Sequence, residues 1–151
     1  RWSKYHSTIL FMWFGYLLYN FLCYDYKMWE YKESIFGHAV LPNHTIITLV
    51  IMFIAYPSSI LIFLGRFPEK KLNMGLWIIF WVALFSLIEF INLRFLNLIS
   101  HHNGWTIGWS VLFNAIIFVM LRMHYKYPTL ALITSIPIII FFVIYFHIPI
   151  R

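Results

Sequence analysis

The sequence predicts an all-α fold: a polytopic membrane protein built as one compact bundle of five transmembrane helices. Composition is the first reason, because 62 % of the residues are hydrophobic and only 11 % are charged, whereas roughly 25 % of an ordinary soluble domain is charged. The mean hydropathy is +0.80. The second reason is that five apolar stretches each approach the ~20 residues that cross a bilayer as a helix. Lipid is therefore the expected solvent of this chain.

The predicted spans are apolar stretches separated by short polar segments, and they cover residues 6–24, 45–65, 75–93, 105–123 and 128–148. Each is expected to be a helix, because an open sheet edge leaves backbone groups unpaired in lipid. The first stretch lacks a small-residue cleavage site, so it is interpreted as a span and not as a signal peptide. No charged stretch and no stretch rich in Ser, Gly or Pro is long enough to be a linker, so one domain over residues 1–151 is expected.

Lysine and arginine residues predict the orientation, because cytoplasmic loops carry an excess of them. Three segments that share one side of a five-span protein hold seven basic residues, namely Arg1, Lys4, Arg66, Lys70, Lys71, Arg122 and Lys126. The other side holds four, namely Lys27, Lys32, Arg94 and Arg151. We therefore expect a cell-membrane protein with a cytoplasmic N-terminus and an external C-terminus. The formal charge of +6 favours contact with anionic lipids, and no nucleic-acid partner is expected.

Polar side chains inside the predicted spans recur at helical spacing, and in lipid such groups usually face another helix. They are Tyr16, Tyr19, Asn20 and Cys23 in the first span, Thr48 and Ser59 in the second, Ser86, Glu89 and Asn92 in the third, and Ser110 and Asn114 in the fourth. Pro57 is expected to free a backbone carbonyl in the second span. The simplest interpretation is that these groups join the helices through hydrogen bonds worth about 1 kcal/mol or less each.

Glu89 is the exception, because a carboxylate about 7 Å inside the outer edge of its span needs a partner or a proton. Arg94 has the wrong helical offset to pair with it. Three partners remain open: Asn20 of the first span, Asn114 of the fourth, or a histidine that folds back from the following loop. That loop contains His101 and His102, then Asn103, with Gly104 as the expected bend and Trp105 as an interfacial anchor.

Several potential metal ligands fall on the predicted outer side, namely Asp25, Glu30, His38, His44, Glu89, His101 and His102. Their spacing matches no metal motif, and adjacent His101 and His102 are expected to diverge. No metal and no other cofactor is therefore expected. The candidate polar cluster comprises Asn20, Asp25, Glu30, Asn43, His44, Glu89, Asn92, His102, Asn103 and Asn114. Among these, Glu89 is the candidate catalytic residue.

Several phrases together carry a family resemblance: LLYNFLCYDYKMWEY, LPNHT, YPSSILIFLGRFP, SHHNGWTIGWSVLFN and LRMHYKYP. From about Tyr16 to Pro128 the chain resembles a family of small, uncharacterised multi-pass membrane proteins of endospore-forming Gram-positive bacteria. The resemblance implies a bacterial inner-membrane protein with five helices, and it implies no activity. The residues that its motifs mark are Asn20, Asp25, Trp29, Glu30, Pro42, Asn43, His44, Thr45, Pro57, Glu89, His102, Asn103, Gly104, Trp105 and Asn114.

A weaker resemblance concerns the order of an acidic–aromatic phrase, a short loop and Leu-Pro at a helix start. This order is similar to that of carotene-cyclase-type membrane domains, which carry acidic residues just after the proline. The present chain has Asn43 and His44 there instead. The departure leaves Glu89 as the one deep carboxylate that could donate a proton.

Three functions are consistent with the sequence. The first is a non-enzymatic membrane protein whose outer polar cluster is structural or binds a ligand or partner. The second is an intramembrane enzyme acting on a lipid or isoprenoid, with Glu89 as acid or base and His44 or His102 beside it. The third is a subunit of an oligomeric transporter or channel. An oligomer is expected because no inverted repeat is evident in five spans, which argues against a transporter formed by one copy of the chain. Membrane lipids, a second copy of the chain or another membrane protein are the expected partners.

Overall fold

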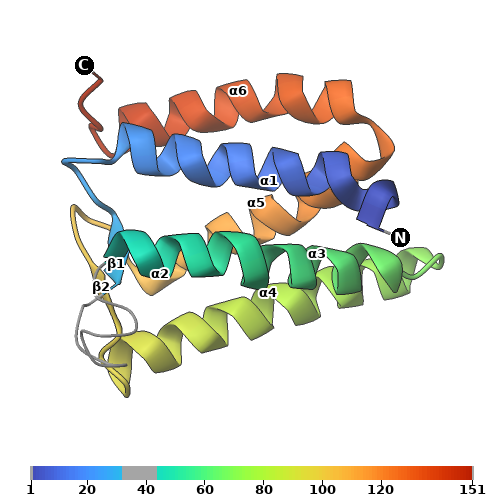
Figure 1. The fold of residues 1–151 in the computed structure, drawn as a ribbon, viewed down its shortest axis with the longest axis horizontal. Coiled ribbons are helices and arrows are strands. Elements are labelled where there is room, and N and C mark those ends of the chain that lie inside the picture. The colour runs from blue at the N-terminus through green and yellow to red at the C-terminus, as the bar shows by residue number, and fades with distance from the viewer. Residues whose placement is uncertain (1, 32–43, 151) are drawn as a thin grey trace.

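The computed structural model describes residues 2–31 and 44–150, which form a bundle of helices with a small β-ribbon at one end (Figure 1). The helices are α1 (Trp2–Leu22), α2 (His44–Val50), the π-helical segment η1 (Ile51–Ala55), α3 (Tyr56–Gly65), α4 (Lys71–Arg94), α5 (Ile107–Lys126) and α6 (Pro128–Tyr145). The strands are β1 (Trp29–Tyr31) and β2 (Ile99–His101). Because α2, η1 and α3 follow one another without a break, the described chain has five helical rods. The predicted helical bundle is confirmed.

In the described part of the chain, four rods are long and apolar enough to cross a membrane: Ile46–Gly65, α4, α5 and α6. The first rod, α1, is not among them, because Lys4, His6 and Asn20 lower its hydropathy. The predicted limits need correction at several ends. Helix α1 begins before residue 6, α4 begins before residue 75, α5 covers a later range than 105–123, and α6 ends before residue 148. Backbone hydrogen bonding continues through polar residues, so hydropathy locates the apolar part of a helix and not its ends.

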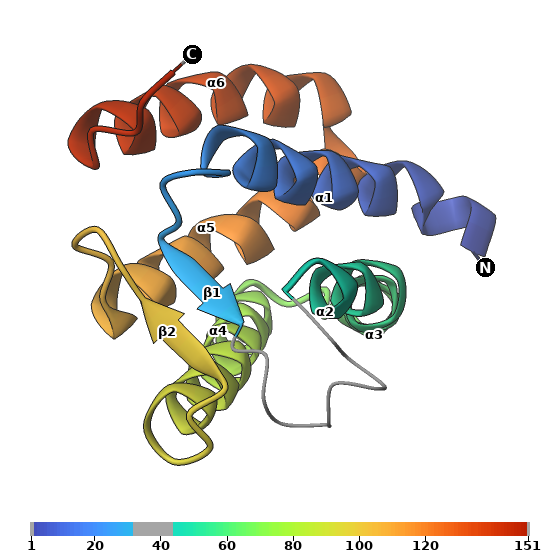
Figure 2. The same cartoon turned by 60° about the vertical axis from the view of Figure 1, so that its left-hand side comes forward.

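The central element of the bundle is α5, which packs against α1, α4 and α6, while α3 packs against α1. Figure 2 shows α5 between the layer of α1 and α6 and the layer of α3 and α4. The main core joins four rods through Ile9 of α1, Phe63 of α3, Trp81 of α4 and Phe118 of α5. Most of α6 is unburied, with Ile144 at 66 % exposure. Such an apolar outer surface is suited to contact with lipid chains.

Pro57 and the π-helical segment before it attach the second rod to α1. In η1 the Tyr56 N–H donates to the Ile51 carbonyl, five residues back. In the same five-residue pattern, the backbone N–H of residue 57 would donate to the Met52 carbonyl. Residue 57 is a proline and has no backbone N–H, so the Met52 carbonyl lacks this donor. The Trp13 indole N–H donates to the Met52 carbonyl instead, at 2.6 Å. The predicted release of a backbone carbonyl near Pro57 is confirmed, and it creates a contact between two rods.

The ribbon pairs two segments about seventy residues apart in the chain, and it was not predicted. Strands β1 and β2 are antiparallel, with Trp29 opposite His101, Glu30 opposite Ser100 and Tyr31 opposite Ile99. After β2 the chain turns at Asn103 and Gly104, which have φ values of 56° and 85°. Two positive φ angles in succession define a tight turn that Asn-Gly favours. The predicted bend at Gly104 is therefore confirmed.

Candidate functional site

The Tyr19 hydroxyl group fixes the ribbon to the end of α1. It accepts hydrogen bonds from the backbone N–H groups of Met28, at 3.3 Å, and Trp29, at 3.2 Å. It donates its own proton to the Trp29 carbonyl, at 3.1 Å. The Tyr19 and Trp29 rings stack with centroids 3.9 Å apart. One hydroxyl group thus satisfies three backbone groups of a strand that has only one neighbouring strand among the described residues.

A set of exposed or half-exposed polar side chains lies at the surface of the ribbon, and we call Lys27, Glu30, Ser100, His102 and Asn103 the cap cluster. Lys27 pairs with Glu30 at 3.1 Å. The second Glu30 oxygen lies 3.8 Å from His102 Nε2, which is also 2.9 Å from the Ser100 hydroxyl. The Asn103 amide donates to the Lys27 carbonyl at 2.7 Å. These contacts tie the segment before β1 to the turn after β2, which is a structural role.

Glu89 faces His101, with 3.6 Å between Glu89 Oε1 and His101 Nε2. The side chains are only 17 % and 10 % exposed. Neither Glu89 Oε2 nor His101 Nε2 has a hydrogen-bond partner within the described residues. The neighbouring His102 points to Glu30 instead, so the predicted divergence of the two histidines is confirmed. Of the three partners left open for Glu89, the structure places the loop histidine beside it.

The two asparagines considered as partners of Glu89 bond elsewhere. The Asn20 amide donates to the Tyr16 carbonyl one turn back in α1, at 2.8 Å. The Asn114 amide donates to the Ser86 hydroxyl at 3.1 Å, which joins α5 to α4 as expected for an interhelical clamp. Of the three open partners, the two asparagines are therefore excluded and the loop histidine remains. The alternation of side chains along β2 turns His101 toward α4, and sequence spacing does not show this.

The remaining predicted site residues are dispersed. Asn92 supplies a backbone carbonyl to the Leu98 N–H at 2.7 Å, in the turn that ends α4. Asp25 is exposed just after α1. Asn43 lies outside the described residues, and His44 is described only as the first residue of α2. Across residues 2–31 and 44–150, no three His, Cys, Asp or Glu side chains lie close enough together to hold a metal ion.

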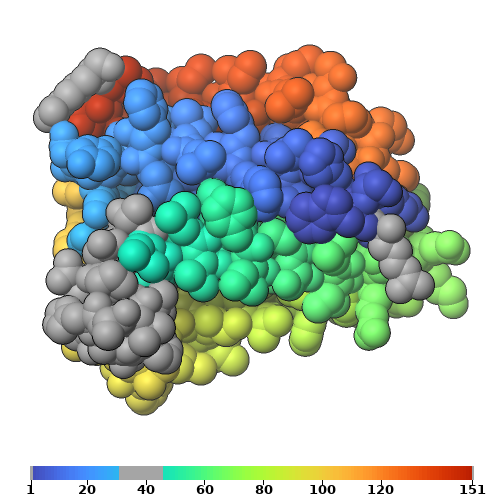
Figure 3. Space-filling view, viewed as in Figure 1, coloured from blue at the N-terminus to red at the C-terminus, as the bar shows by residue number. Residues whose placement is uncertain are grey.

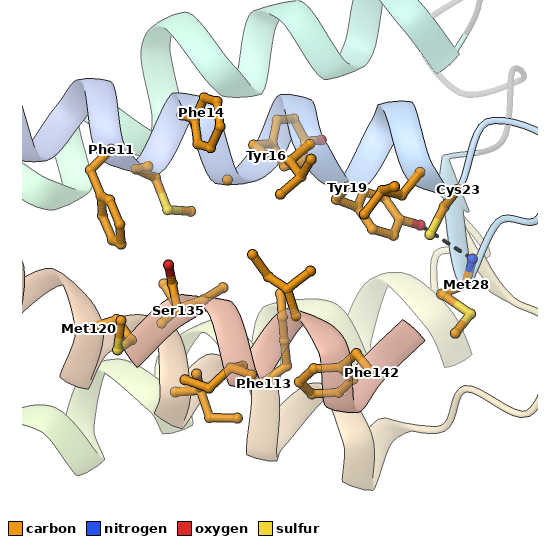
Figure 4. A pocket seen from close by; sticks show the side chains of 18 of the residues that line it. Phe11, Phe14, Tyr16, Tyr19, Cys23, Met28, Phe113, Met120, Ser135 and Phe142 are labelled. Atoms are coloured by element: carbon orange, nitrogen blue, oxygen red, sulfur yellow. Dashed lines mark hydrogen bonds between the residues drawn. The ribbon is translucent and has the colours of Figure 1, made fainter. Parts of the chain in front are cut away.

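A cavity of about 220 Å³ lies between α1 on one side and α5 and α6 on the other (Figure 4). Its lining is almost wholly apolar, and among the rings that face it are Phe11, Tyr16, Tyr19, Phe113 and Phe142. Phe11 and Met120 lie at one end, and Cys23 and Met28 lie at the other. Phe11 lies in α1, and Cys23, twelve residues later, directly follows the last residue of this helix, so the cavity extends about 18 Å along the bundle.

The ribbon closes one end of this cavity. Met28 and Trp29 of the β1 segment belong to the lining, together with Trp105 and Ile148. Trp105 is buried and donates its indole N–H to the Ser110 hydroxyl at 2.7 Å. Among residues 2–31 and 44–150, no charged side chain lines the cavity. The polar contacts of the cap cluster therefore lie outside a closed, apolar cavity end.

The side of the cavity is open between α1 and α6. Phe14, Gly15 and Leu132 line it and are themselves exposed. A Cβ atom added at Gly15 would meet nothing within 4 Å. Figure 3 shows α1 between α6 and the α2–α3 rod on one face of the molecule. Because Gly15 has no side chain, the space between α1 and α6 stays open there to the medium that surrounds the bundle.

Most of the cavity was not predicted from the sequence. The polar stripe of the first span includes three lining residues, Tyr16, Tyr19 and Cys23, whereas Asn20 is not in the lining. Apart from Ser135, the lining residues of α5 and α6 are ordinary apolar residues of membrane helices. Ser135 is the one polar residue on the α6 side of the cavity, so it is the only residue there that the sequence could have marked.

Comparison of the chain with protein-family models, with curated proteins and with solved structures found no match.

Proposed function

We propose that this protein is a non-enzymatic integral membrane protein that binds the hydrocarbon chain of a lipid in the cavity between α1, α5 and α6. The single observation that supports the proposal is the elongated, uncharged cavity with an open side between two helices. A hydrocarbon chain is the occupant that suits such a lining, because it fills the space with dispersion contacts and brings no polar group that would need a partner. The cap cluster then has a structural role, because it holds the ribbon that closes one end.

An enzymatic role for Glu89 receives less support. The carboxylate lies on α4, and it belongs to the lining of neither described cavity. A general acid or base must come within hydrogen-bond reach of the atom that it serves. Glu89 does not come within such reach of a hydrocarbon chain bound between α1 and α6.

We expect the substitution Gly15→Leu to weaken chain binding about tenfold, because the added side chain would occupy the open side of the cavity. The measurement is photolabelling of the purified protein in nanodiscs with a diazirine derivative of hexadecane. Labelling of cavity residues should saturate and should be displaced by excess hexadecane. Peptide mapping should place the saturable label on α1, α5 and α6.

Gly75→Leu is the matched control, since Gly75 is also an exposed helical glycine with open space around it, but it lies on α4 away from the cavity. This variant should keep the wild-type labelling. Equal, unsaturable labelling of α4 and the cavity helices would contradict the proposal. So would equal loss of labelling in both variants.

The proposal includes five membrane spans and a cytoplasmic N-terminus in a bacterial cell membrane. Support comes from the positions of the basic residues. The N-terminus, the loop between α3 and α4 and the junction of α5 and α6 lie at one end of the bundle (Figure 1). Of the described residues, that end carries Lys4, Arg66, Lys70, Lys71, Arg122 and Lys126. Arg122 of α5 stacks on Phe67 at 4.1 Å, which holds the loop between α3 and α4 against α5.

Cysteine labelling of intact cells tests this orientation. Cys23 is 3 % exposed, so Cys23→Ala provides a cysteine-free background with little change at the surface. In that background Tyr24→Cys should react with a membrane-impermeant maleimide in intact cells, because it lies at the ribbon end. Lys70→Cys should react only after the cells are permeabilised. The opposite pattern would reverse the orientation, and reaction of both in intact cells would show that the rod of α2, η1 and α3 does not cross the membrane.

A further inference from the structure

A second, smaller cavity lies in the core of the bundle, next to the apolar one. Its volume is about 40 Å³, which exceeds the roughly 10–15 Å³ that one water molecule requires. It is enclosed by α1, α3, α4 and α5, and four of its lining residues also line the larger cavity: Met12, Tyr56, Ile117 and Leu121. The two cavities are thus separated by a single layer of side chains.

The smaller cavity differs from the larger one in its chemistry, because Ser59 and Asn114 contribute polar groups to it. Ser59 is half-buried, and its hydroxyl group has no hydrogen-bond partner among residues 2–31 and 44–150. Asn114 uses one amide N–H for Ser86. A primary amide has two N–H donors and a carbonyl oxygen, so hydrogen-bonding capacity remains on the side that faces the cavity.

A polar group without a partner in this position has an energetic cost, because the cavity lies inside the membrane-crossing part of the bundle. Ser59 is six residues from the end of its candidate span, and Asn114 is seven residues from the start of its own. No charged residue of the described part of the chain lines this cavity. An ionised ligand group would therefore be unfavourable here, whereas a neutral hydroxyl or carbonyl group would satisfy Ser59 and Asn114.

We infer that the smaller cavity is a polar subsite for the end of a neutral single-chain lipid that carries a hydroxyl or carbonyl group. The chain occupies the larger cavity, and its polar end passes Met12 to reach Ser59 and Asn114. Met12 is suited to this position, since an unbranched thioether side chain changes its conformation at low cost. The inference rests on the proposed function, because it assigns the ligand class of the same site.

The test compares hexadecanol with hexadecane as competitors of the diazirine label described above. In the wild-type protein hexadecanol should displace the label at about one-tenth of the hexadecane mole fraction, as one or two net hydrogen bonds predict. Ser59→Ala should reduce this tenfold preference at least threefold while leaving competition by hexadecane unchanged. The variant removes a hydroxyl group that bonds to no described residue, so it should fold normally.

Ser58→Ala is the control, because the adjacent Ser58 hydroxyl is exposed and donates to the Ile54 carbonyl outside either cavity. It should keep the full preference for hexadecanol. An unchanged preference in Ser59→Ala, or equal potency of the two competitors on the wild-type protein, would overturn the subsite and leave the proposed function standing. Failure of both competitors to displace the label would overturn both.

A straight-chain alcohol and an isoprenoid alcohol share the chemistry that the subsite recognises. Geranylgeraniol in place of hexadecanol distinguishes these two sources. The alcohol that displaces the label at the lower mole fraction identifies the chain type. Whichever alcohol this is, the subsite requires that it competes less well in Ser59→Ala and equally well in Ser58→Ala.

Discussion

The substitution Tyr19→Phe is expected to lower the free energy of unfolding by about 3 kcal/mol, because it leaves several partly buried backbone groups without a partner. The hydroxyl group serves the N–H groups of Met28 and Trp29 and the carbonyl of Trp29. The ring stack with Trp29 survives in the variant, so the loss reports the hydroxyl group alone. Unfolding of the protein by dodecyl sulfate in mixed micelles, followed by tryptophan fluorescence, measures the change.

Tyr26→Phe is the matched control for this experiment. Tyr26 packs against the same buried cluster as Tyr19, and its hydroxyl group has no hydrogen bond in the described part of the chain. Its removal should change stability by no more than about 0.5 kcal/mol. In Tyr19→Phe the amides of Met28 and Trp29 should also exchange with deuterium faster. Equal stability of the two variants, with unchanged exchange, would contradict the role assigned to Tyr19.

The Glu89–His101 pair is the second site where a large effect is expected. Removing one partner of a buried pair typically costs about 3–5 kcal/mol, whereas an apolar replacement of both partners is often neutral or stabilising. His101→Leu and Glu89→Leu should each destabilise the protein by about 3 kcal/mol. The double variant should lie within about 1 kcal/mol of the wild type. The same unfolding assay measures the free energy of unfolding of the wild type, the two single variants and the double variant, which completes the double-mutant cycle.

A second pair in the same protein provides the control. Glu30 and His102 lie 3.8 Å apart, nearly the separation of Glu89 and His101, but their side chains are 38 % and 47 % exposed. Exposed ion pairs contribute about 1 kcal/mol or less. The coupling energy of Glu30 and His102 should therefore be several times smaller. Additive effects at Glu89 and His101 would show that the two groups do not depend on each other.

Much of the fold could be predicted because the bilayer limits the choices open to the chain. Apolar stretches of sufficient length must form helices in lipid, so the helical rods were predictable from the length and position of these stretches. The Asn103–Gly104 bend was also predictable, because Gly tolerates the positive φ that the turn requires. Pro57 gave a third local signal, since the missing N–H has consequences within one turn of its own helix.

The neighbours of each helix could not be predicted in the same way. Lipid chains are as apolar as leucine, so hydropathy does not show which face of a membrane helix meets another helix. Asn20 and Asn114 looked equally able to meet Glu89. Asn20 instead bonds within its own helix, and Asn114 reaches Ser86.

The sequence by itself determined the helical class, because the apolar stretches that form the helices follow from local composition. Only the tertiary structure decided that β1 pairs with β2, that His101 faces Glu89, and that α1 and α6 enclose a cavity with α5. These features join segments far apart in the chain. Their physical cause is the packing of whole helices, and single positions such as Gly15 acquire their meaning only when that packing is known.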